Sequence, residues 1–350
     1  MRCQCLTEFG HPFVEVERPD LVASGTEVVL RVTGAGLCHS DIAARRGGHS
    51  LGNGRMLRYT DRGMKLPVVL GHEIAGVILS VGPDVGELDQ TLNYAIYPWA
   101  GCGKCFACRK GNEHHCASPR TPGFHMDGGF ATMIKVSHPR YLFDIGDIDP
   151  TFAATFSCSG LTSYSALKRV QDTMSDVPLV IIGAGGLGLM CISLVKALGG
   201  VAPVVVEPDA ARRDAALALG AKLALDPRAE DAAAAIRSAA GGKVPAVIDF
   251  HVSEDTAALS LDLVMKGGKI ILVGLHGGVA PWPLAVLTTT AVSIIGTVTG
   301  SPVEFGEFID IVARGGVTAP PLHLRSMSEL NAQTDALERG EIVGRVVLIP

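Results

Sequence analysis

Several features are missing from this sequence, and each absence excludes a class of protein. There is no excess of positive charge: 30 Lys and Arg stand against 35 Asp and Glu, a net charge of −5. This balance argues against nucleic acid or an acidic membrane surface as the main partner. The opening stretch, MRCQCLTEFGHPF, has no positive segment followed by an apolar one, so no secretory signal is expected. The sequence also shows no internal repeat and no low-complexity segment.

Long uninterrupted apolar runs are missing as well. The uncharged segment 177–195 carries four glycines in its middle, and the uncharged segment 270–303 carries Pro281, Pro283 and several more glycines. Such residues would break a single membrane-spanning helix, whereas buried parallel strands covered by helices on both faces read as short apolar runs. We therefore expect buried strands in both segments and no contact with a membrane.

Nine cysteines are present, and without a secretory signal they indicate a reducing compartment, the cytoplasm. Clustered thiols in such a compartment bind metal more often than they form disulfides. The stretch GCGKCFACRKGNEHHC has the spacing C-x2-C-x2-C-x7-C, formed by Cys102, Cys105, Cys108 and Cys116. Four thiolates close a tetrahedron around one Zn²⁺ with no open position, which is a structural site. An iron–sulfur cluster is the alternative, and disulfides are a third. His114 and His115 are expected to be solvated loop residues.

The chain of 350 residues favours two domains. Residues 1 to about 150 are rich in glycine, proline and alternating segments such as EVVLRVTG, the period of half-buried strands. From about residue 175, short apolar strands alternate with helices, as where PLVIIG is followed by LGLMCISLVKALG. This alternation predicts an α/β domain with a doubly wound parallel sheet. The last part of the chain loses the alternation and ends in an apolar strand, GRVVLIP.

A dinucleotide site is predicted where the first of these strands ends. GAGGLG, residues 183–188, gives G-x-G-x-x-G directly after a strand and at the start of a helix. The first glycine makes a tight turn, the second lets a pyrophosphate approach the backbone, and the third allows close packing of helix and strand. Glu207, 19 residues after Gly188, ends the next strand, where a carboxylate accepts both hydroxyls of the adenosine ribose.

The choice between NAD and NADP depends on the charges around Glu207. The carboxylate would repel a 2′-phosphate, so NAD is favoured over NADP. Arg212 and Arg213 weaken this preference, because an arginine near this point can bind a 2′-phosphate. The predicted cofactor-binding residues of this region are Gly183, Gly185, Gly186, Leu187, Gly188, Glu207 and Arg212.

A second set of metal-binding residue types is dispersed along the chain. GLCHSD contains Cys38, LGHEIAG contains His72 and Glu73, and FSCSGLTSY contains Cys158. Cys, His and Cys together leave the fourth position of a zinc ion free for water or substrate, the set known from alcohol dehydrogenase. Asp41 is a suitable acceptor for the far ring nitrogen of His72.

With these motifs the sequence resembles the zinc-dependent medium-chain alcohol dehydrogenases, from about residue 25 to the C-terminus. The resemblance rests on CHSD, GHEIAG, the four-cysteine stretch, CSGLTSY, GAGGLG and GRVVL. It implies two Zn²⁺ per subunit, NAD, and reversible oxidation of a primary, secondary or cyclic alcohol to an aldehyde or ketone. It also implies a mainly β, GroES-like catalytic domain (residues 1–152 and 296–350), a Rossmann domain (residues 153–295), and a homo-oligomer, either a tetramer or a dimer.

The resemblance also assigns roles to single residues. Cys38, His72 and Cys158 would bind the catalytic zinc, with Glu73 close behind as an alternate ligand, and the four-cysteine stretch would bind the structural zinc. Ser40 would hydrogen-bond the substrate oxygen and start a proton relay. The other residues would face the cofactor: His39 and Arg345 the pyrophosphate, Thr162 the nicotinamide, and Val273 and Leu275 the nicotinamide pocket.

Two features depart from the family pattern. Ala43 stands where many relatives have a histidine at the outer end of the proton relay. The link from Cys38 to His72 is longer than usual and contains a basic segment, residues 45–65. This segment is expected at the mouth of the active-site cleft. It is either a solvated loop or subunit contact, or a flap whose arginines steer an anionic group.

Other functions stay open at this point. An NADP-linked aldehyde or ketone reductase would use the same scaffold. A non-catalytic dinucleotide-binding protein would be expected to have lost zinc ligands, and this sequence keeps all three. A polyol dehydrogenase is less favoured, because that branch commonly lacks the cysteine found here as Cys158.

Overall fold

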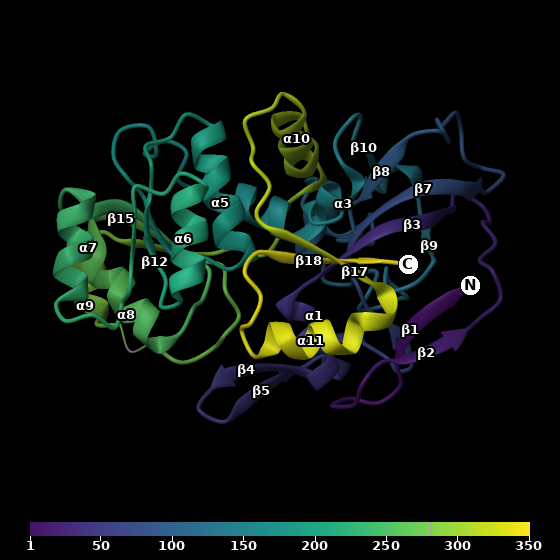
Figure 1. Cartoon of the computed structure of the whole chain (residues 1–350), viewed down its shortest axis with the longest axis horizontal. Helices are drawn as coiled ribbons and strands as arrows, with labels where there is room; N and C mark the ends of the chain where they lie inside the picture. Colours follow the sequence, from purple (N-terminus) through teal and green to yellow (C-terminus); the bar gives the residue numbers. More distant parts are fainter. Residues whose placement is uncertain (281) are drawn as a thin grey trace.

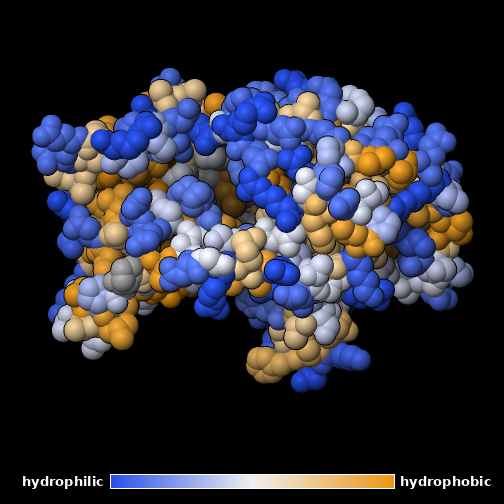
Figure 2. Space-filling model, turned by 90° about the horizontal axis from the view of Figure 1, so that it is seen from below, coloured by the Kyte–Doolittle hydropathy of each residue, from blue (hydrophilic) through white to orange (hydrophobic). Residues whose placement is uncertain are grey.

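The computed structural model describes residues 1–280 and 282–350. Figure 1 shows a strand-rich half, which contains both chain ends, beside a half in which helices flank a parallel sheet. Seen from below, the surface is hollowed between the two halves (Figure 2).

The strand-rich half is built on a seven-stranded sheet centred on β3 (Val28–Leu37). β7 (Glu73–Val81) and β18 (Arg345–Ile349) pair antiparallel with β3, and the register sets Gly36 opposite Glu73 and Leu37 opposite Val346. The end of β3 and the starts of β7 and β18 therefore meet at one edge. The closing apolar strand predicted from GRVVLIP is confirmed as β18. The other strands are β8 (Asn93–Ile96), β9 (Met133–Val136), β10 (Leu142–Asp144) and β17 (Leu322–Ser326).

Smaller elements surround this sheet. A three-stranded sheet has the order β2-β1-β6, and β4 pairs with β5 in a separate hairpin. Their bounds are β1 (Arg2–Leu6), β2 (Val14–Glu17), β4 (Gly48–Gly52), β5 (Arg55–Arg58) and β6 (Val68–Val69). The helices of this half are α1 (His39–Arg46), α2 (Phe106–Arg109), α3 (Pro150–Ala153), α10 (Pro302–Ala313) and α11 (Leu330–Glu338), with short 3₁₀ turns η1 (Thr60–Arg62), η2 (Glu113–His115), η3 (Pro139–Tyr141) and η5 (Met327–Glu329).

The other half has six parallel strands in the order β13-β12-β11-β14-β15-β16. This order confirms the predicted doubly wound sheet, and it reverses between β11 and β14, where such sheets bind their ligands. The strands are β11 (Val180–Ile182), β12 (Val204–Val206), β13 (Leu223–Leu225), β14 (Val244–Asp249), β15 (Val264–Leu272) and β16 (Ser293–Gly296). The helices are α5 (Gly186–Ala197), α6 (Ala210–Ala218), α7 (Ala232–Ala240), α8 (Glu254–Leu263) and α9 (Leu284–Thr290).

A helical block joins the two halves. The π-helical turn η4 (Phe156–Gly160) runs directly into α4 (Leu161–Lys168), which packs against α5 and α10. Phe156 meets Phe308 edge to face with ring centroids 4.9 Å apart, and a Cβ on Gly160 would lie only 2.5 Å from the Phe308 ring. Aromatic packing and a required glycine therefore hold η4 in place.

The expectation of buried strands holds for the first apolar segment and only in part for the second, whose strand β16 is at most half-buried because it lies at the edge of its sheet. Segment 177–195 contains β11 and most of α5, and segment 270–303 contains the end of β15, then α9, β16 and the start of α10. Pro281 lies outside the described residues. No helix in the described ranges has both the length and the apolar character needed to cross a membrane. The predicted domain limits stay a prediction; the limit before residue 296 falls one residue inside β16.

Candidate functional site

Three predicted metal ligands converge from distant parts of the chain. Cys38 directly follows β3 and caps α1, His72 precedes β7, and Cys158 lies on η4. In η4 the Gly160 N–H donates to the Thr155 carbonyl at 3.1 Å, a five-residue step of the kind found at functional sites. The Sγ atoms of both cysteines and one ring nitrogen of His72 all lie within 4.8 Å of one another, and all three residues are buried.

The geometry of this set fits a zinc ion. Asp41 Oδ1 lies 3.3 Å from His72 Nδ1, and Asp41 Oδ2 accepts the Cys38 N–H at 3.0 Å. His72 Nε2 is buried without a partner among the described residues, so its lone pair is available to a metal. The two Sγ atoms are 4.0 Å apart, close to the about 3.8 Å expected of two sulfurs on a tetrahedral Zn²⁺.

Without a metal ion, only the pKa of Cys38 is shifted toward the metal-binding form, whereas the pKa values of His72 and Cys158 are both raised. The hydrogen bond from Cys158 lowers the pKa of Cys38 well below its usual value, despite burial. Burial disfavours a charged imidazole, but the Asp41 carboxylate outweighs it and raises the pKa of His72. The thiolate is the form of cysteine that binds metals. The site therefore supplies one thiolate readily even before an ion is bound.

Glu73 lies behind this set in a buried ion pair. One carboxylate oxygen accepts the Ser159 N–H at 2.9 Å, and the other pairs with the Arg345 guanidinium. Burial raises the pKa of Glu73 to about 7, although Arg345 opposes the shift. The Arg345 side chain also occupies the space where a Cβ on Gly186 would lie, so it reaches the glycine turn. Arg345 Nε is buried without a partner among the described residues.

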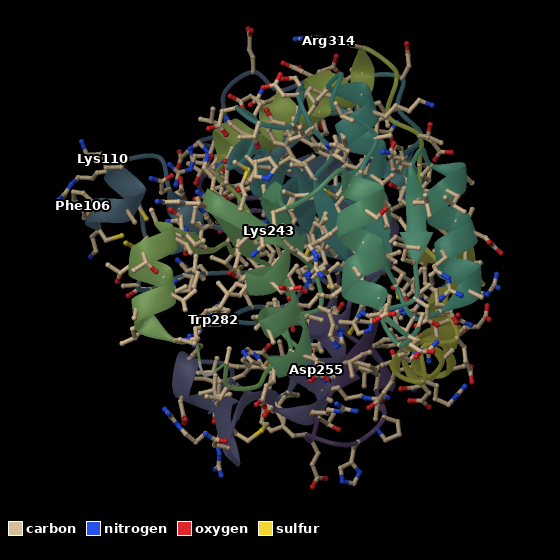
Figure 3. All side chains as sticks on the ribbon, turned by 90° about the vertical axis from the view of Figure 1, so that its left-hand side faces the viewer. Phe106, Lys110, Lys243, Asp255, Trp282 and Arg314 are labelled. Atoms are coloured by element: carbon tan, nitrogen blue, oxygen red, sulfur yellow. The ribbon has the colours of Figure 1, made fainter. Side chains whose placement is uncertain are left out.

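The four-cysteine stretch forms a second, separate cluster. Cys105 Sγ lies 3.4 Å from Cys108 Sγ and 3.8 Å from Cys116 Sγ, and all four sulfurs lie within 4.8 Å of one another. The cluster sits on a lobe that projects from the body, where Figure 3 labels Phe106 and Lys110. No ligand position is left over for a substrate, so the arrangement fits a structural ion.

A buried carboxylate ties this lobe to the sheet. Glu113 accepts the Gly101 N–H at 2.8 Å and the Tyr141 hydroxyl at 2.6 Å. The expectation of two solvated histidines is wrong for His114, whose Nδ1 is buried; only His115 is exposed. His114 as a whole is half-buried, and its ring lies against that of His115 with centroids 3.9 Å apart.

The glycine turn has the geometry of a dinucleotide site. Gly183 has φ +90°, which a residue with a side chain rarely adopts. A Cβ on Gly188 would collide with the Gly183 carbonyl, whereas a Cβ on Gly185 would meet no heavy atom within 4 Å. As predicted, Gly183 makes the tight turn, Gly185 leaves the backbone open to a pyrophosphate, and Gly188 allows the close packing of helix and strand. Leu187, in the first turn of α5, accepts the Ser163 hydroxyl at 2.8 Å through its carbonyl.

The charged side chains of Glu207, Arg212 and Arg213 are already hydrogen-bonded to backbone groups. Glu207 is buried, and its carboxylate accepts the Ala184 N–H at 2.7 Å and the Asp209 N–H at 2.9 Å. Arg213 donates to the Glu207 carbonyl at 2.9 Å. Arg212 donates to the carbonyls of Gly340 at 2.8 Å and Ile342 at 3.3 Å, so its guanidinium ties α6 to the segment before β18.

The remaining predicted residues differ in exposure. Ser40 is half-buried with its hydroxyl 3.7 Å from Cys38 Sγ, while His39 is exposed. Thr162 is buried and its hydroxyl has no partner among the described residues. Val273 is 8 % exposed, as expected of a pocket residue, but Leu275 is 58 % exposed. The structure therefore does not enclose Leu275 in a pocket.

The sequence did not predict the aromatic residues that lie beside His72. The rings of Trp99 and Phe124 lie with centroids 5.5 and 5.3 Å from that of His72, and Tyr59 meets Phe124 edge to face at 5.6 Å. One signal was available, since Trp99 is one of only two tryptophans in the chain. The partners of these rings come from separate loops, which local patterns do not reveal.

The basic segment folds into the β4–β5 hairpin and η1. Arg45 pairs with Asp335 at 2.9 Å and Glu338 at 2.7 Å on α11, and Arg46 also pairs with Glu338. A Cβ on Gly52, near the hairpin tip, would lie 2.8 Å from Gly278 of the other half. The hairpin therefore reaches across to the parallel-sheet half, in keeping with a place at the cleft mouth.

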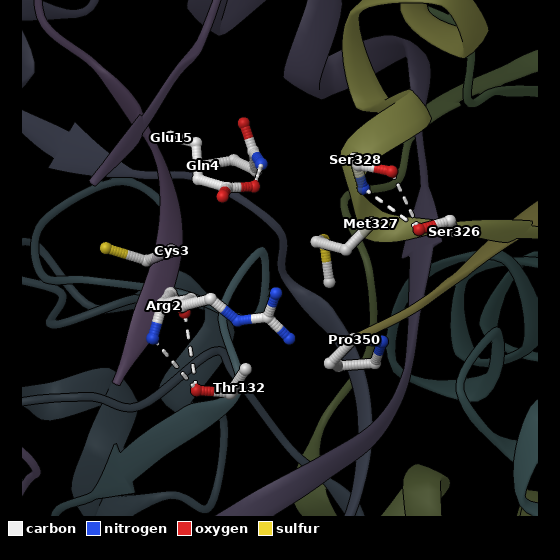
Figure 4. A pocket seen from close by; sticks show the side chains of 9 residues that line it. All are labelled: Arg2, Cys3, Gln4, Glu15, Thr132, Ser326, Met327, Ser328 and Pro350. Atoms are coloured by element: carbon white, nitrogen blue, oxygen red, sulfur yellow. Dashed lines mark hydrogen bonds between the residues drawn. The ribbon is translucent and has the colours of Figure 1, made fainter. Parts of the chain in front are cut away.

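A small cavity lies elsewhere. Its volume is about 100 Å³, and Figure 4 shows it between β1, η5 and the C-terminal Pro350. None of the predicted site residues lines it.

A parallel sheet with a phosphate-binding turn, next to a buried donor set and a separate four-thiol cluster, defines a metal-dependent dehydrogenase. Two family models match the chain: Alcohol dehydrogenase GroES-like domain over residues 24–147, and Zinc-binding dehydrogenase over residues 186–314. The chain belongs to the zinc-dependent medium-chain alcohol dehydrogenase family, and it is an oxidoreductase acting on CH–OH groups. The predicted fold of a Rossmann domain with a GroES-like domain is thereby confirmed.

Individual relatives match over the whole chain. The NAD-dependent alcohol dehydrogenase of Sulfurisphaera tokodaii is 35 % identical over 351 residues, covering 100 % of both chains. That of Saccharolobus solfataricus is 34 % identical over 351 residues with the same coverage. Among solved structures, the alcohol dehydrogenase of Aeropyrum pernix superposes with a TM-score of 0.90 at 28 % identity and covers 100 % of both chains.

Replacing Asp41 by Asn should weaken zinc binding at the buried set roughly ten- to hundredfold. The negative charge of Asp41 orients His72 and raises the pKa of its ring. The amide of Asn carries no charge, so this support is lost. The measurement is zinc content after dialysis against graded chelator, followed by elemental analysis. Asp89→Asn, a change at an exposed carboxylate, is the matched control and should behave as the unmodified protein. Equal zinc retention in both variants would contradict the assigned role of Asp41.

Proposed function

We propose that this protein is an NAD-dependent zinc alcohol dehydrogenase that reversibly oxidises a primary, secondary or cyclic alcohol to an aldehyde or ketone. The observation that carries the proposal is the buried set of Cys38, His72 and Cys158, in which His72 Nε2 has no partner within residues 1–280 and 282–350. The relatives named NAD-dependent alcohol dehydrogenase support the same reaction.

We infer two Zn²⁺ per subunit with unequal roles. Cys38, His72 and Cys158 would hold one ion, and the four-cysteine lobe would hold the other. A zinc bound by the three-residue set supplies Lewis-acid chemistry, which lowers the pKa of an alcohol oxygen. The four-thiol ion contributes folding energy.

The residues around the three-residue set then position the reacting groups. Ser40, with its hydroxyl 3.7 Å from Cys38 Sγ, would hydrogen-bond the substrate oxygen and receive its proton while giving up its own. Ala43 offers no further acceptor, so the final proton transfer from Ser40 would use water or another group. Asp41 keeps His72 in one orientation, and the next residue, Glu73, is held by its ion pair with Arg345.

NAD fits the chemistry of the glycine turn. It would accept the hydride when bound, which is the cofactor's own chemistry. The pyrophosphate would approach the open face at Gly185, near the unpartnered Nε of Arg345. The adenosine ribose would meet the carboxylate of Glu207. The nicotinamide would lie against Thr162 and Val273. Arg212 and Arg213 already donate to backbone carbonyls, which supports NAD over NADP.

We also propose a homo-oligomer, a dimer or a tetramer, working in a reducing compartment such as the cytoplasm. β16 pairs on one side with β15 and ends its sheet among the described residues. Beside it, α9 exposes Leu284 by 77 % and Val286 by 39 %. An open strand edge next to apolar side chains is a surface that proteins normally cover.

The proposal of a reducing compartment rests on the cysteines, because both thiol clusters would lose their metal-binding form if they were oxidised.

The function is tested with a pair of cysteine variants. The unmodified protein should contain two zinc ions per subunit and reduce NAD with simple alcohols. Cys158→Ser should abolish turnover while the melting temperature stays nearly unchanged, because it removes one ligand of the open set. Cys105→Ser should instead lower the melting temperature. Elemental analysis that finds one zinc, or iron, or an active Cys158→Ser enzyme would refute the proposal.

The cofactor preference is tested at Glu207. Glu207→Ala should improve the use of NADP relative to NAD, because a repulsive charge and the ribose hydrogen bonds are removed together. The readout is the ratio of kcat/KM values for NAD and NADP. Glu207→Gln, which removes the charge but keeps an acceptor oxygen, should shift the ratio less. A higher kcat/KM with NADP in the unmodified enzyme would identify an NADP-linked reductase.

The oligomer is tested by light scattering. The unmodified protein should elute at twice or four times the monomer mass of 36.5 kDa. Charged substitutions at Leu284 and Val286 should shift the mass downward, whereas the same change at exposed Val22, on the other half, should not. A monomer mass for the unmodified protein would exclude the proposal.

A further inference from the structure

We propose that the active site selects alcohols whose carbinol carbon carries a planar ring, and that Tyr59, Trp99 and Phe124 are its specificity-determining residues. The inference rests on the proposed function and names the substrate class of that same site. It follows from how three rings gather beside His72.

Two of the rings flank the metal ligand directly. The Trp99 and Phe124 rings tilt at 57° and 46° to the His72 ring, with centroids 5.5 and 5.3 Å from it. His72 itself is 0 % exposed, whereas Trp99 and Phe124 are only half-buried. Each ring therefore touches a fully buried ligand and still leaves part of its surface open. Side chains in that position line the approach to the metal set.

Trp99 is fixed in one orientation. Its Nε1–H donates to the Ser157 carbonyl at 2.8 Å, next to the ligand Cys158. This bond uses the only polar atom of the indole. The part of the ring that stays open is therefore apolar.

The third ring comes from the basic segment. Tyr59 follows the β4–β5 hairpin, is 9 % exposed, and meets Phe124 edge to face at 5.6 Å and 80°. Its hydroxyl lies 3.1 Å from His49 Nδ1, and its carbonyl accepts the N–H groups of Arg62 and Met64 at 3.0 Å. His49 is thus a positioning residue that holds the Tyr59 ring through its hydroxyl.

Tyr59 also stays an uncharged phenol near the metal ligands. Burial raises the pKa of Tyr59 to about 12, and the negative charges of Cys38 and Asp41 add to the shift. The phenol ring lies one ring away from the donor set, since its edge meets Phe124, which lies against His72. By contrast, the hairpin cations Arg55 and Arg58 are exposed. The segment therefore contributes an aromatic side chain to the cleft rather than a charge that would bind an anion.

This lining favours a flat ring over a chain of equal size. Aromatic rings attract one another in edge-to-face and offset arrangements beyond what the buried area contributes, and an aliphatic substrate cannot use this gain. One such contact changes selectivity roughly three- to tenfold. With three rings around the approach, the effect is large enough to set the substrate ranking.

The test compares benzyl alcohol with cyclohexylmethanol, which carries the same number of carbons but no planar ring. The quantity measured is the ratio of their kcat/KM values at saturating NAD, with zinc-loaded enzyme. Differences in intrinsic reactivity cancel when this ratio is compared between variants. Phe124→Leu and Tyr59→Leu should each lower the ratio roughly three- to tenfold. Tyr59→Phe keeps the ring and should preserve it, and His49→Leu should lower it less than Tyr59→Leu.

Phe143→Leu is the matched control. Phe143 is also a half-buried phenylalanine in an aromatic cluster, with Tyr97 and Phe305, and it does not contact the donor set. Its loss should lower stability as Phe124→Leu does and leave the ratio unchanged. If the Leu variants do not fold, the unmodified enzyme still decides: toluene should inhibit oxidation of 1-hexanol at least about threefold more strongly than methylcyclohexane.

The outcomes separate the two proposals. An enzyme that oxidises none of these alcohols with NAD would overturn the proposed function. An enzyme that oxidises them, but whose ratio is unaffected by Phe124→Leu and Tyr59→Leu, would overturn the ring selectivity alone. So would equal inhibition by toluene and methylcyclohexane.

Discussion

The active site depends on the pairing of β3 with β7 and β18. This register sets Gly36 opposite Glu73 and Leu37 opposite Val346. Cys38 directly follows β3, His72 directly precedes β7, and Arg345 begins β18, so all three meet at one sheet edge. Gly36 must be glycine, because a Cβ there would collide with the Glu73 carboxylate. A shift of one residue in either pairing would turn the ligands to opposite faces of the sheet.

Charged side chains are buried around the donor set, and each carboxylate among them is hydrogen-bonded or paired. Asp41 serves His72 and Cys38, while Glu73 is shared between Ser159 and Arg345. Charges buried in this way are costly unless each is paired and hydrogen-bonded. Three of the buried polar atoms that lack a partner in the described part of the chain are therefore informative: His72 Nε2 belongs to the donor set, and the Thr162 hydroxyl and Arg345 Nε belong to the predicted cofactor side. They are the atoms that a zinc ion and a dinucleotide would satisfy.

The long link between Cys38 and His72 connects several parts of the molecule. Its arginines at 45 and 46 hold α11, its hairpin tip reaches the loop at Gly278, and Tyr59 reaches the rings beside His72. A segment with these contacts is more than a solvated loop. The segment therefore joins α11, the loop at Gly278 and the rings beside His72.

The sequence by itself determined the features that depend on short spacing. Four cysteines within one stretch can reach a single ion, and a glycine pattern between a strand and a helix makes a phosphate-binding turn, because both geometries are completed within a few residues. The set of Cys38, His72 and Cys158 is different, since its members are far apart along the chain and their role came from the resemblance to the family. Only the tertiary structure decided which distant side chains meet. It brought Trp99, Phe124 and Tyr59 together around His72, buried His114 Nδ1, left Leu275 exposed and directed Arg212 to Gly340. These contacts join segments far apart along the chain, and packing selects them, so no local pattern records them.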